Sequence, residues 1–102
     1  MSKFSAVALS LLALSATPTF ASDALLKKHN CTACHAIDKK VVGPAYKDVA
    51  KKYASDGNAV ANLAKKIKAG GSGVWGPIPM PPHPQVPDQD IRALVKYILS
   101  QK

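Results

Sequence analysis

Apolar residues recur with helical spacing in two stretches of the chain. The first stretch has the i, i+3, i+4, i+7 spacing of a buried stripe and consists of Val60, Leu63, Ala64 and Ile67. The second runs from about Asp88 to Ser100 and consists of Ile91, Leu94, Val95, Ile98 and Leu99. Asp88 and Asp90 suit the positive N-terminal end of a helix. We therefore expect two amphipathic helices, the first of which ends at Gly70-Gly71.

Two shorter helices are expected upstream. Ser22 or Asp23 can cap a first helix that continues into the segment beginning at Cys31. Gly43-Pro44 breaks the chain, and its proline can occupy the first turn of a short helix that reaches about Tyr53. No convincing strand pattern accompanies these helices. The expected fold class is therefore all-α, with about four helices.

The first 21 residues have the pattern of an export signal. Lys3 precedes an apolar stretch from Ala6 to Ala16, and Thr19-Phe20-Ala21 offers a small-residue cleavage site. This stretch is about half as long as a membrane-spanning helix must be. We expect Met1–Ala21 to be a signal peptide and residues 22–102 to form one domain without a membrane span.

Charge and size limit the partners and the stability of this domain. The chain carries 14 Lys+Arg against 6 Asp+Glu, a formal net charge of +8, which becomes +7 when Lys3 leaves with the leader. A basic exported domain needs an anionic partner or surface. Nucleic acid is not expected as that partner, because the chain has no nucleic-acid-binding motif. A core drawn from about 80 residues is marginal by itself, so a cofactor is expected to complete it.

The pentapeptide Cys31-Thr32-Ala33-Cys34-His35 has the form C-x-x-C-H and contains both cysteines of the chain. It is typical of covalent haem attachment, in which each thiol adds to a vinyl group and the histidine binds the iron. A thioredoxin-like redox centre requires a βαβ context, and a zinc site would combine these donors with His83. A disulfide across so short a loop stabilises little and leaves His35 unexplained. We favour haem attachment.

The segment between the two amphipathic helices, residues 70–87, is rich in proline. Six of the eight prolines of the chain lie in it, so neither a helix nor a central strand is expected there. Met80 lies in the middle of this stiff segment and is the only methionine besides Met1. A loop methionine is usually an apolar gap-filler, but beside a haem it is the natural sixth ligand of the iron. His83 is its rival.

Taken together, these segments resemble the small class I bacterial cytochromes c, in particular the cytochrome c-551/c-552 group. The matching segments are CTACHAID, VVGPAYKDVAKKYA, LAKKIKAGGSGVWGPIPMPP and the terminal LSQK. The resemblance covers nearly all of residues 22–102. It implies the small cytochrome c fold, with about four helices around one covalently bound haem c. It also implies a periplasmic electron carrier that is not an enzyme, and we expect a monomer.

The resemblance further implies the residues that hold the haem. Cys31 and Cys34 take the two thioether positions, and His35 and Met80 take the two axial positions on the iron. Pro44 corresponds to the family proline whose backbone carbonyl accepts a hydrogen bond from the ligand histidine. Such a contact fixes the tautomer and the basicity of the imidazole.

Two further positions correspond to residues near the haem propionates, and one departs from the family. Trp75 corresponds to the tryptophan whose indole N–H reaches a propionate; a core aromatic is the plainer interpretation, and the two roles are compatible. Lys66 stands where relatives commonly carry an arginine, so bidentate pairing is lost. His83 replaces an asparagine near the methionine ligand, and its imidazole can change charge near neutral pH.

An iron with both axial positions filled has no open site for a substrate, so outer-sphere electron transfer is the expected function. Exposed basic residues would steer the carrier to an acidic patch on its partner; the candidates are Lys27, Lys28, Lys39, Lys40, Lys51 and Lys52. The resemblance implies a quinol-oxidising cytochrome complex as donor, and a periplasmic nitrite reductase or terminal oxidase as acceptor, in respiration and denitrification. The rival class is a peroxidase-like or gas-sensing haem protein in which Met80 is labile or is no ligand.

Overall fold

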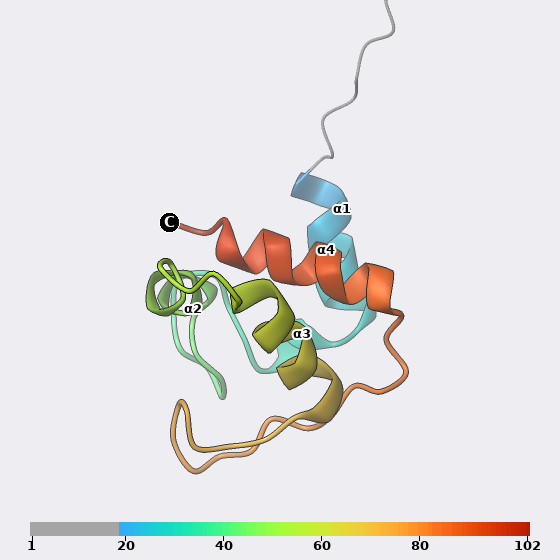
Figure 1. Cartoon of the computed structure of the whole chain (residues 1–102). Helices are drawn as coiled ribbons and strands as arrows, with labels where there is room; N and C mark the ends of the chain where they lie inside the picture. Colours follow the sequence, from blue (N-terminus) through green and yellow to red (C-terminus); the bar gives the residue numbers. More distant parts are fainter. Residues whose placement is uncertain (1–18) are drawn as a thin grey trace, which may run out of the picture.

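Residues 19–102 are described by a computed structural model and form four α-helices, one 3-10 turn and no β-sheet. The elements are α1 (Thr19–Lys28), the 3-10 turn η1 (Cys31–Ala33), α2 (Tyr46–Lys52), α3 (Ala59–Ala69) and α4 (Asp88–Leu99) (Figure 1). The all-α class is confirmed. Most of the predicted signal peptide lies outside the described residues. Between residues 19 and 102, no helix has the length and apolar character needed to cross a membrane.

Helix α4 packs against α1, α2 and α3 and forms the centre of the core (Figure 1). Its buried side chains are Ile91, Leu94, Val95 and Ile98, and they pack with Leu26, Tyr46, Val49 and Val86. Full burial of such a side chain contributes about 1.5–3 kcal/mol. The predicted apolar face of α4 is therefore confirmed, except that Leu99 is only half-buried.

The first helix ends before the cysteines, which differs from the sequence prediction. Helix α1 stops at Lys28, and Asn30 adopts the left-handed conformation, with φ 61° and ψ 22°. Asparagine tolerates this conformation better than most residues, and the chain then restarts in η1. The expected caps Ser22 and Asp23 lie inside α1. Asp23 instead accepts a hydrogen bond of 2.7 Å from the Tyr97 hydroxyl, which ties α1 to α4.

Helix α3 buries less of its apolar stripe than the spacing predicts. Leu63, Ala64 and Ile67 are half-buried against the core, whereas Val60 is 38% exposed. The reason is that α3 contacts no helix other than α4 within residues 19–102, so one flank of the stripe has no helix over it. The predicted end of this helix is confirmed, since Gly70 follows its last residue.

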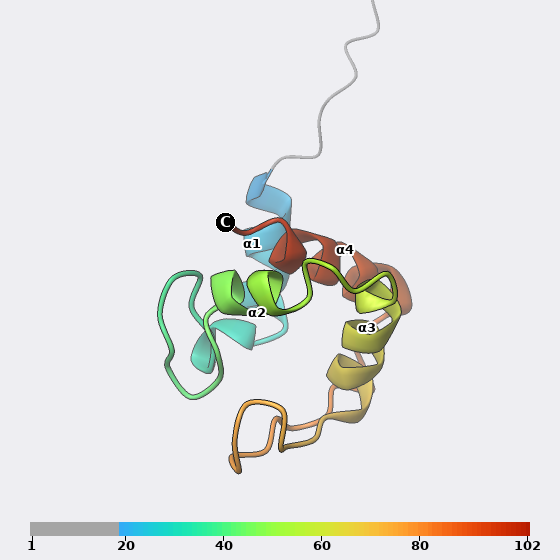
Figure 2. The same cartoon turned by 60° about the vertical axis from the view of Figure 1, so that its left-hand side comes forward.

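The two segments that carry the candidate chemistry extend away from α4. Figure 2 shows η1 below α2 and the loop after it extending along the left of α2, whereas residues 70–82 form a long loop that leaves the end of α3. In both views this loop lies on the side of the molecule away from α4. The helical core therefore supports two loops, one with the C-x-x-C-H pentapeptide and one with Met80.

Candidate cofactor-binding site

Backbone hydrogen bonds close the C-x-x-C-H pentapeptide into a tight turn. The Cys31 carbonyl accepts the N–H of Cys34 at 3.2 Å and that of His35 at 3.0 Å. Both thiols are free and half-buried. Burial raises the pKa of the Cys31 thiol, whereas a thioredoxin-like redox centre depends on a lowered one. The environment of Cys31 therefore disfavours the thioredoxin-like alternative.

Three neighbours fix the His35 imidazole. Its Nδ1 lies 2.8 Å from the carbonyl oxygen of Pro44. Because a carbonyl only accepts, Nδ1 donates this hydrogen bond, which leaves Nε2 as the ring nitrogen that can bind a metal. The ring stacks on that of Tyr46, with centroids 5.0 Å apart and planes 18° apart. A Cβ at Gly43 would lie 2.4 Å from Cε1 of the imidazole, so glycine is required there. His35 is thus held in an orientation in which Nε2 is available as a ligand atom.

Sequence reasoning misses the roles of Gly43 and Tyr46. It assigns Gly43 only a break in the chain before Pro44, and it assigns no role to Tyr46. Both residues belong to the matching segment VVGPAYKDVAKKYA, which was the one available signal. Their contacts with His35 depend on the loop folding back over the pentapeptide, where the Cys34 carbonyl accepts the N–H of Gly43 at 2.7 Å.

The backbone around Met80 is held at two points. Gly71 and Met80 exchange a pair of backbone hydrogen bonds of 3.0 and 2.8 Å. The adjacent Gly70 has φ +69°, and a Cβ there would lie 2.5 Å from the Met80 carbonyl oxygen. Further along, the His83 N–H donates to the Ile67 carbonyl at 3.0 Å. The Met80 segment is therefore anchored at the end of α3 through Met80 itself and through His83.

Trp75 lies in the proline-rich segment, and Lys66, in the last turns of α3, comes close to the start of this segment. Trp75 is 40% exposed, which overturns its interpretation as a core aromatic. The Nζ of Lys52 lies 5.6 Å from the centroid of the Trp75 ring. Lys66 is half-buried, and its Nζ would be 3.0 Å from a Cβ at Gly71.

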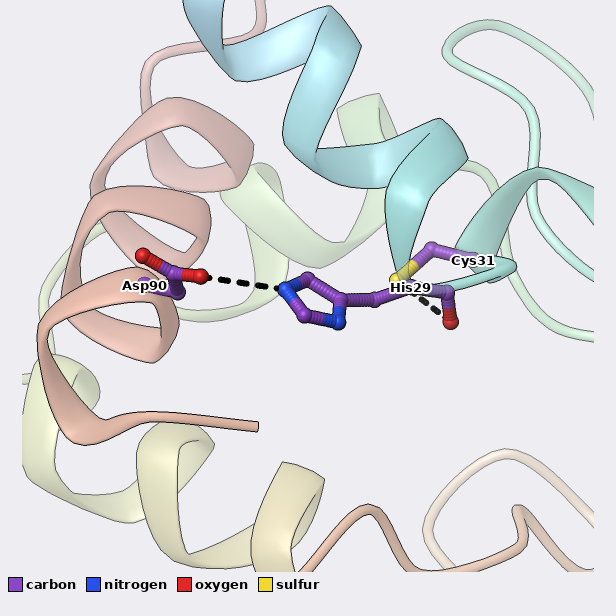
Figure 3. A network of polar contacts seen from close by, with 3 residues as sticks. All are labelled: His29, Cys31 and Asp90. Carbon is purple, nitrogen blue, oxygen red and sulfur yellow. Dashed lines mark hydrogen bonds and ion pairs between the residues drawn. The ribbon is translucent and has the colours of Figure 1, made fainter. Parts of the chain in front are cut away.

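His29, just before the pentapeptide, is engaged with helix α4. Its Nε2 lies 3.1 Å from Oδ2 of Asp90 (Figure 3), and these side chains are only 10% and 23% exposed. The His29 carbonyl is also the partner of the Cys31 thiol, at 3.9 Å. The contact between His29 and Asp90 anchors the start of the C-x-x-C-H turn to helix α4 and engages the imidazole of His29.

The zinc alternative is contradicted by the positions of the donors. In the described part of the chain, no three His, Cys, Asp or Glu side chains gather as they would around a metal ion. The proposed set of Cys31, Cys34, His35 and His83 is therefore not brought together.

Apolar side chains are exposed on the two loops. Of the six large hydrophobic residues that are exposed in the described chain, five belong to these loops: Val41, Val42, Val74, Trp75 and Ile78. Exposed apolar surface of this kind marks a binding site for a ligand or partner. Two free thiols, a pre-oriented imidazole, an anchored methionine and an apolar rim fit a covalently bound haem. This fold and these donors define a small class I c-type cytochrome.

Comparisons with known proteins agree with this class. The profile of the Cytochrome c family matches residues 22–102. The chain is 58% identical to cytochrome c-551 of Pseudomonas aeruginosa over 80 residues, which cover 78% of this chain and 76% of that protein. It is 52% identical to cytochrome c-552 of Nitrosomonas europaea over 96 residues, which cover 82% of this chain and 93% of that protein.

Solved structures give the same result. The crystal structure of wild-type Nitrosomonas europaea cytochrome c552 is similar with a TM-score of 0.76 and 56% identity, covering 78% of this chain and 99% of that one. The crystal structure of the class 1 cytochrome MtoD from Sideroxydans lithotrophicus ES-1 is similar with a TM-score of 0.70 and 30% identity, covering 84% of this chain and 98% of that one. The chain belongs to the cytochrome c family, in its c-551/c-552 group. Members of this group are small electron carriers, not enzymes, and membership implies a covalently bound haem c.

Proposed function

We propose that this chain is a periplasmic monohaem cytochrome that passes single electrons between respiratory partners, with His35 and Met80 as the axial ligands of the iron. The proposal is carried by the 2.8 Å contact of His35 Nδ1 with the Pro44 carbonyl, because it leaves Nε2 free to bind a metal. Export to the periplasm rests on the predicted signal peptide, Met1–Ala21.

The chain's own residues would hold the haem from several directions. The thiols of Cys31 and Cys34 would hold the haem covalently, each through addition of its S–H bond across a vinyl group, with the sulfur on one vinyl carbon and the hydrogen on the other. His35 and Met80 would supply the two protein ligands of the iron. By family resemblance we assign Trp75 and Lys66 to the propionates, and the exposed Trp75 is accessible for this role.

When bound, the haem supplies a one-electron couple between ferrous and ferric iron. Ligation by methionine and histidine raises the reduction potential. With both His35 and Met80 bound to it, the iron would have no open coordination site for a substrate. The two anchors, at Met80 and at His83, hold this segment to the end of α3, which favours electron transfer with little rearrangement.

The partners would be redox proteins with acidic docking patches. All six lysines singled out in the sequence are exposed: Lys27, Lys28, Lys39, Lys40, Lys51 and Lys52. Exposed basic residues raise the rate of encounter with an acidic surface. We propose a quinol-oxidising cytochrome complex as donor and a nitrite reductase or terminal oxidase as acceptor, in respiration and denitrification, with the carrier acting as a monomer.

The proposal is tested by absorbance spectra of the purified protein before and after reduction, with and without carbon monoxide. A carrier with two firm axial ligands should show a haem spectrum and bind carbon monoxide poorly at neutral pH. Ready binding of carbon monoxide by the reduced protein would instead indicate a gas-sensing or peroxidase-like haem protein. His35→Ala should prevent a stable haem protein, and normal maturation with an unchanged spectrum would contradict the proximal assignment.

A further inference from the structure

The hydrogen bonds of residues 70–82 do not reach the half of the fold that carries the C-x-x-C-H pentapeptide. Gly70 donates to the Lys66 carbonyl in α3, Gly71 pairs with Met80, and Gly73 donates to Gly76. Within residues 19–102 these bonds all run inside the segment or to α3. Figure 2 shows the same arrangement, with the loop attached to the end of α3 and extending past it. Its far end therefore depends on some other contact to stay in place.

Lys52 and Trp75 supply a contact at that end. Lys52 is the last residue of α2, and its Nζ lies 5.6 Å from the centroid of the Trp75 ring. This distance is within the range of about 6 Å for a cation–π interaction. Helix α2 also begins with Tyr46, whose ring stacks on His35. The contact thus joins the helix that supports one proposed iron ligand to the loop that carries the other.

We propose that Lys52 is a positioning residue: its ammonium group latches the Trp75 ring, and with it the Met80 loop, to α2. This inference rests on the proposed function, because it assigns the latch to the loop that closes over the haem. The neighbouring Lys51 is equally charged and exposed, but it has no contact with the Trp75 ring. A general effect of positive charge would be shared by both lysines, whereas a latch belongs to Lys52 alone.

The single tryptophan of the chain makes the contact measurable by NMR in the reduced holoprotein. The ε-methylene protons of Lys52 should be shifted upfield by the ring current of Trp75, and Trp75→Phe should reduce the shift. In Lys52→Met, which keeps the aliphatic stem without the charge, exchange of the indole N–H with solvent should rise roughly two- to five-fold. Lys51→Met is the matched control and should show no rise, and Lys52→Arg should restore the slow exchange.

The sign of the change separates the latch from simple electrostatics. Removing a positive charge lowers the local concentration of hydroxide, which by itself slows base-catalysed exchange of the indole N–H. Faster exchange of the Trp75 indole N–H in Lys52→Met would therefore show that the Trp75 ring is no longer held in place. The rate at which imidazole binds the ferric protein should rise by the same factor, because it requires the loop to open.

Two outcomes are distinguished. If the protein shows a methionine-ligated haem spectrum, but Lys52→Met exchanges its indole N–H no faster than Lys51→Met, the latch is overturned and the proposed function stands. If the purified protein has no haem spectrum, the proposed function fails and the latch with it.

Discussion

Replacing Gly43 with alanine should displace the His35 imidazole. The added Cβ would lie 2.4 Å from Cε1, 2.8 Å from Nδ1 and 2.9 Å from Nε2 of that ring, whereas ordinary contact begins at 3.4 Å. The ring or the loop must therefore move by about 1 Å. The ring cannot move freely, because the Pro44 carbonyl holds Nδ1 and Tyr46 stacks on the ring.

The expected cost follows from these contacts. Overpacking of this kind costs about 1–3 kcal/mol, and loss of the hydrogen bond between His35 and Pro44 costs about 0.5–1.5 kcal/mol. The free energy of unfolding should fall by about 1.5–4.5 kcal/mol in sum. For a domain of this size, that corresponds to a decrease in Tm of roughly 6–36 °C.

The assay is thermal unfolding of the ferric holoprotein, followed by far-ultraviolet circular dichroism and by haem absorbance. Gly57→Ala is the matched control, since nothing lies within 4 Å of a Cβ at Gly57. That variant should be unchanged or stabilised by about 0.4–1 kcal/mol, because alanine restricts the unfolded chain. If Gly43→Ala unfolded within about 2 °C of this control, close packing against His35 would be refuted.

Three further predictions concern the surface of the fold. The hydrogen bond to Asp23 raises the pKa of Tyr97. This bond therefore stabilises the fold at pH values below the ordinary tyrosine pKa of about 10, and the stabilisation is lost as pH rises through the raised pKa of the folded state. When urea unfolding is measured from neutral to alkaline pH, the free energy of unfolding should fall less for Tyr97→Phe than for wild type. In acidic buffer, a double-mutant cycle with His29→Ala and Asp90→Asn should give a coupling of about 0.5–1.5 kcal/mol, and zero coupling would show that this pair adds nothing. Electron transfer to an acidic partner should slow as salt rises, because exposed charges are screened beyond about 10 Å at 0.1 M, and a flat profile would contradict steering by the lysines.

Elements with a strong apolar period could be predicted from the sequence. The five apolar positions of α4 repeat over three turns, so the spacing alone fixes the face that packs on the core. The end of α1 could not be predicted, because it depends on the left-handed conformation of a single residue, Asn30. The partial burial of Leu63 and Ile67 could not be predicted either, because it depends on which helices lie beside α3 and not on the apolar pattern of α3 itself.

Some residues of the candidate site could likewise be predicted from the sequence, and others could not. Cys31, Cys34 and His35 are contiguous, so their chemistry is visible as a motif. The contact of Gly43 with His35 joins residues eight positions apart in a loop that has no regular period. The contact of Lys52 with Trp75 joins two elements that are distant in the chain. Contacts of this kind follow from the path of the backbone and leave no repeating pattern in the sequence.

The ligands of the iron are tested most directly by the ferric absorbance spectra of wild type, Met80→Ala and His83→Ala. Wild type should show the methionine-to-iron charge-transfer band, His83→Ala should keep it, and Met80→Ala should lose it while gaining the ability to bind carbon monoxide when reduced. An unchanged spectrum in Met80→Ala, together with an altered one in His83→Ala, would replace Met80 by His83 as the distal ligand and contradict the proposed ligand set.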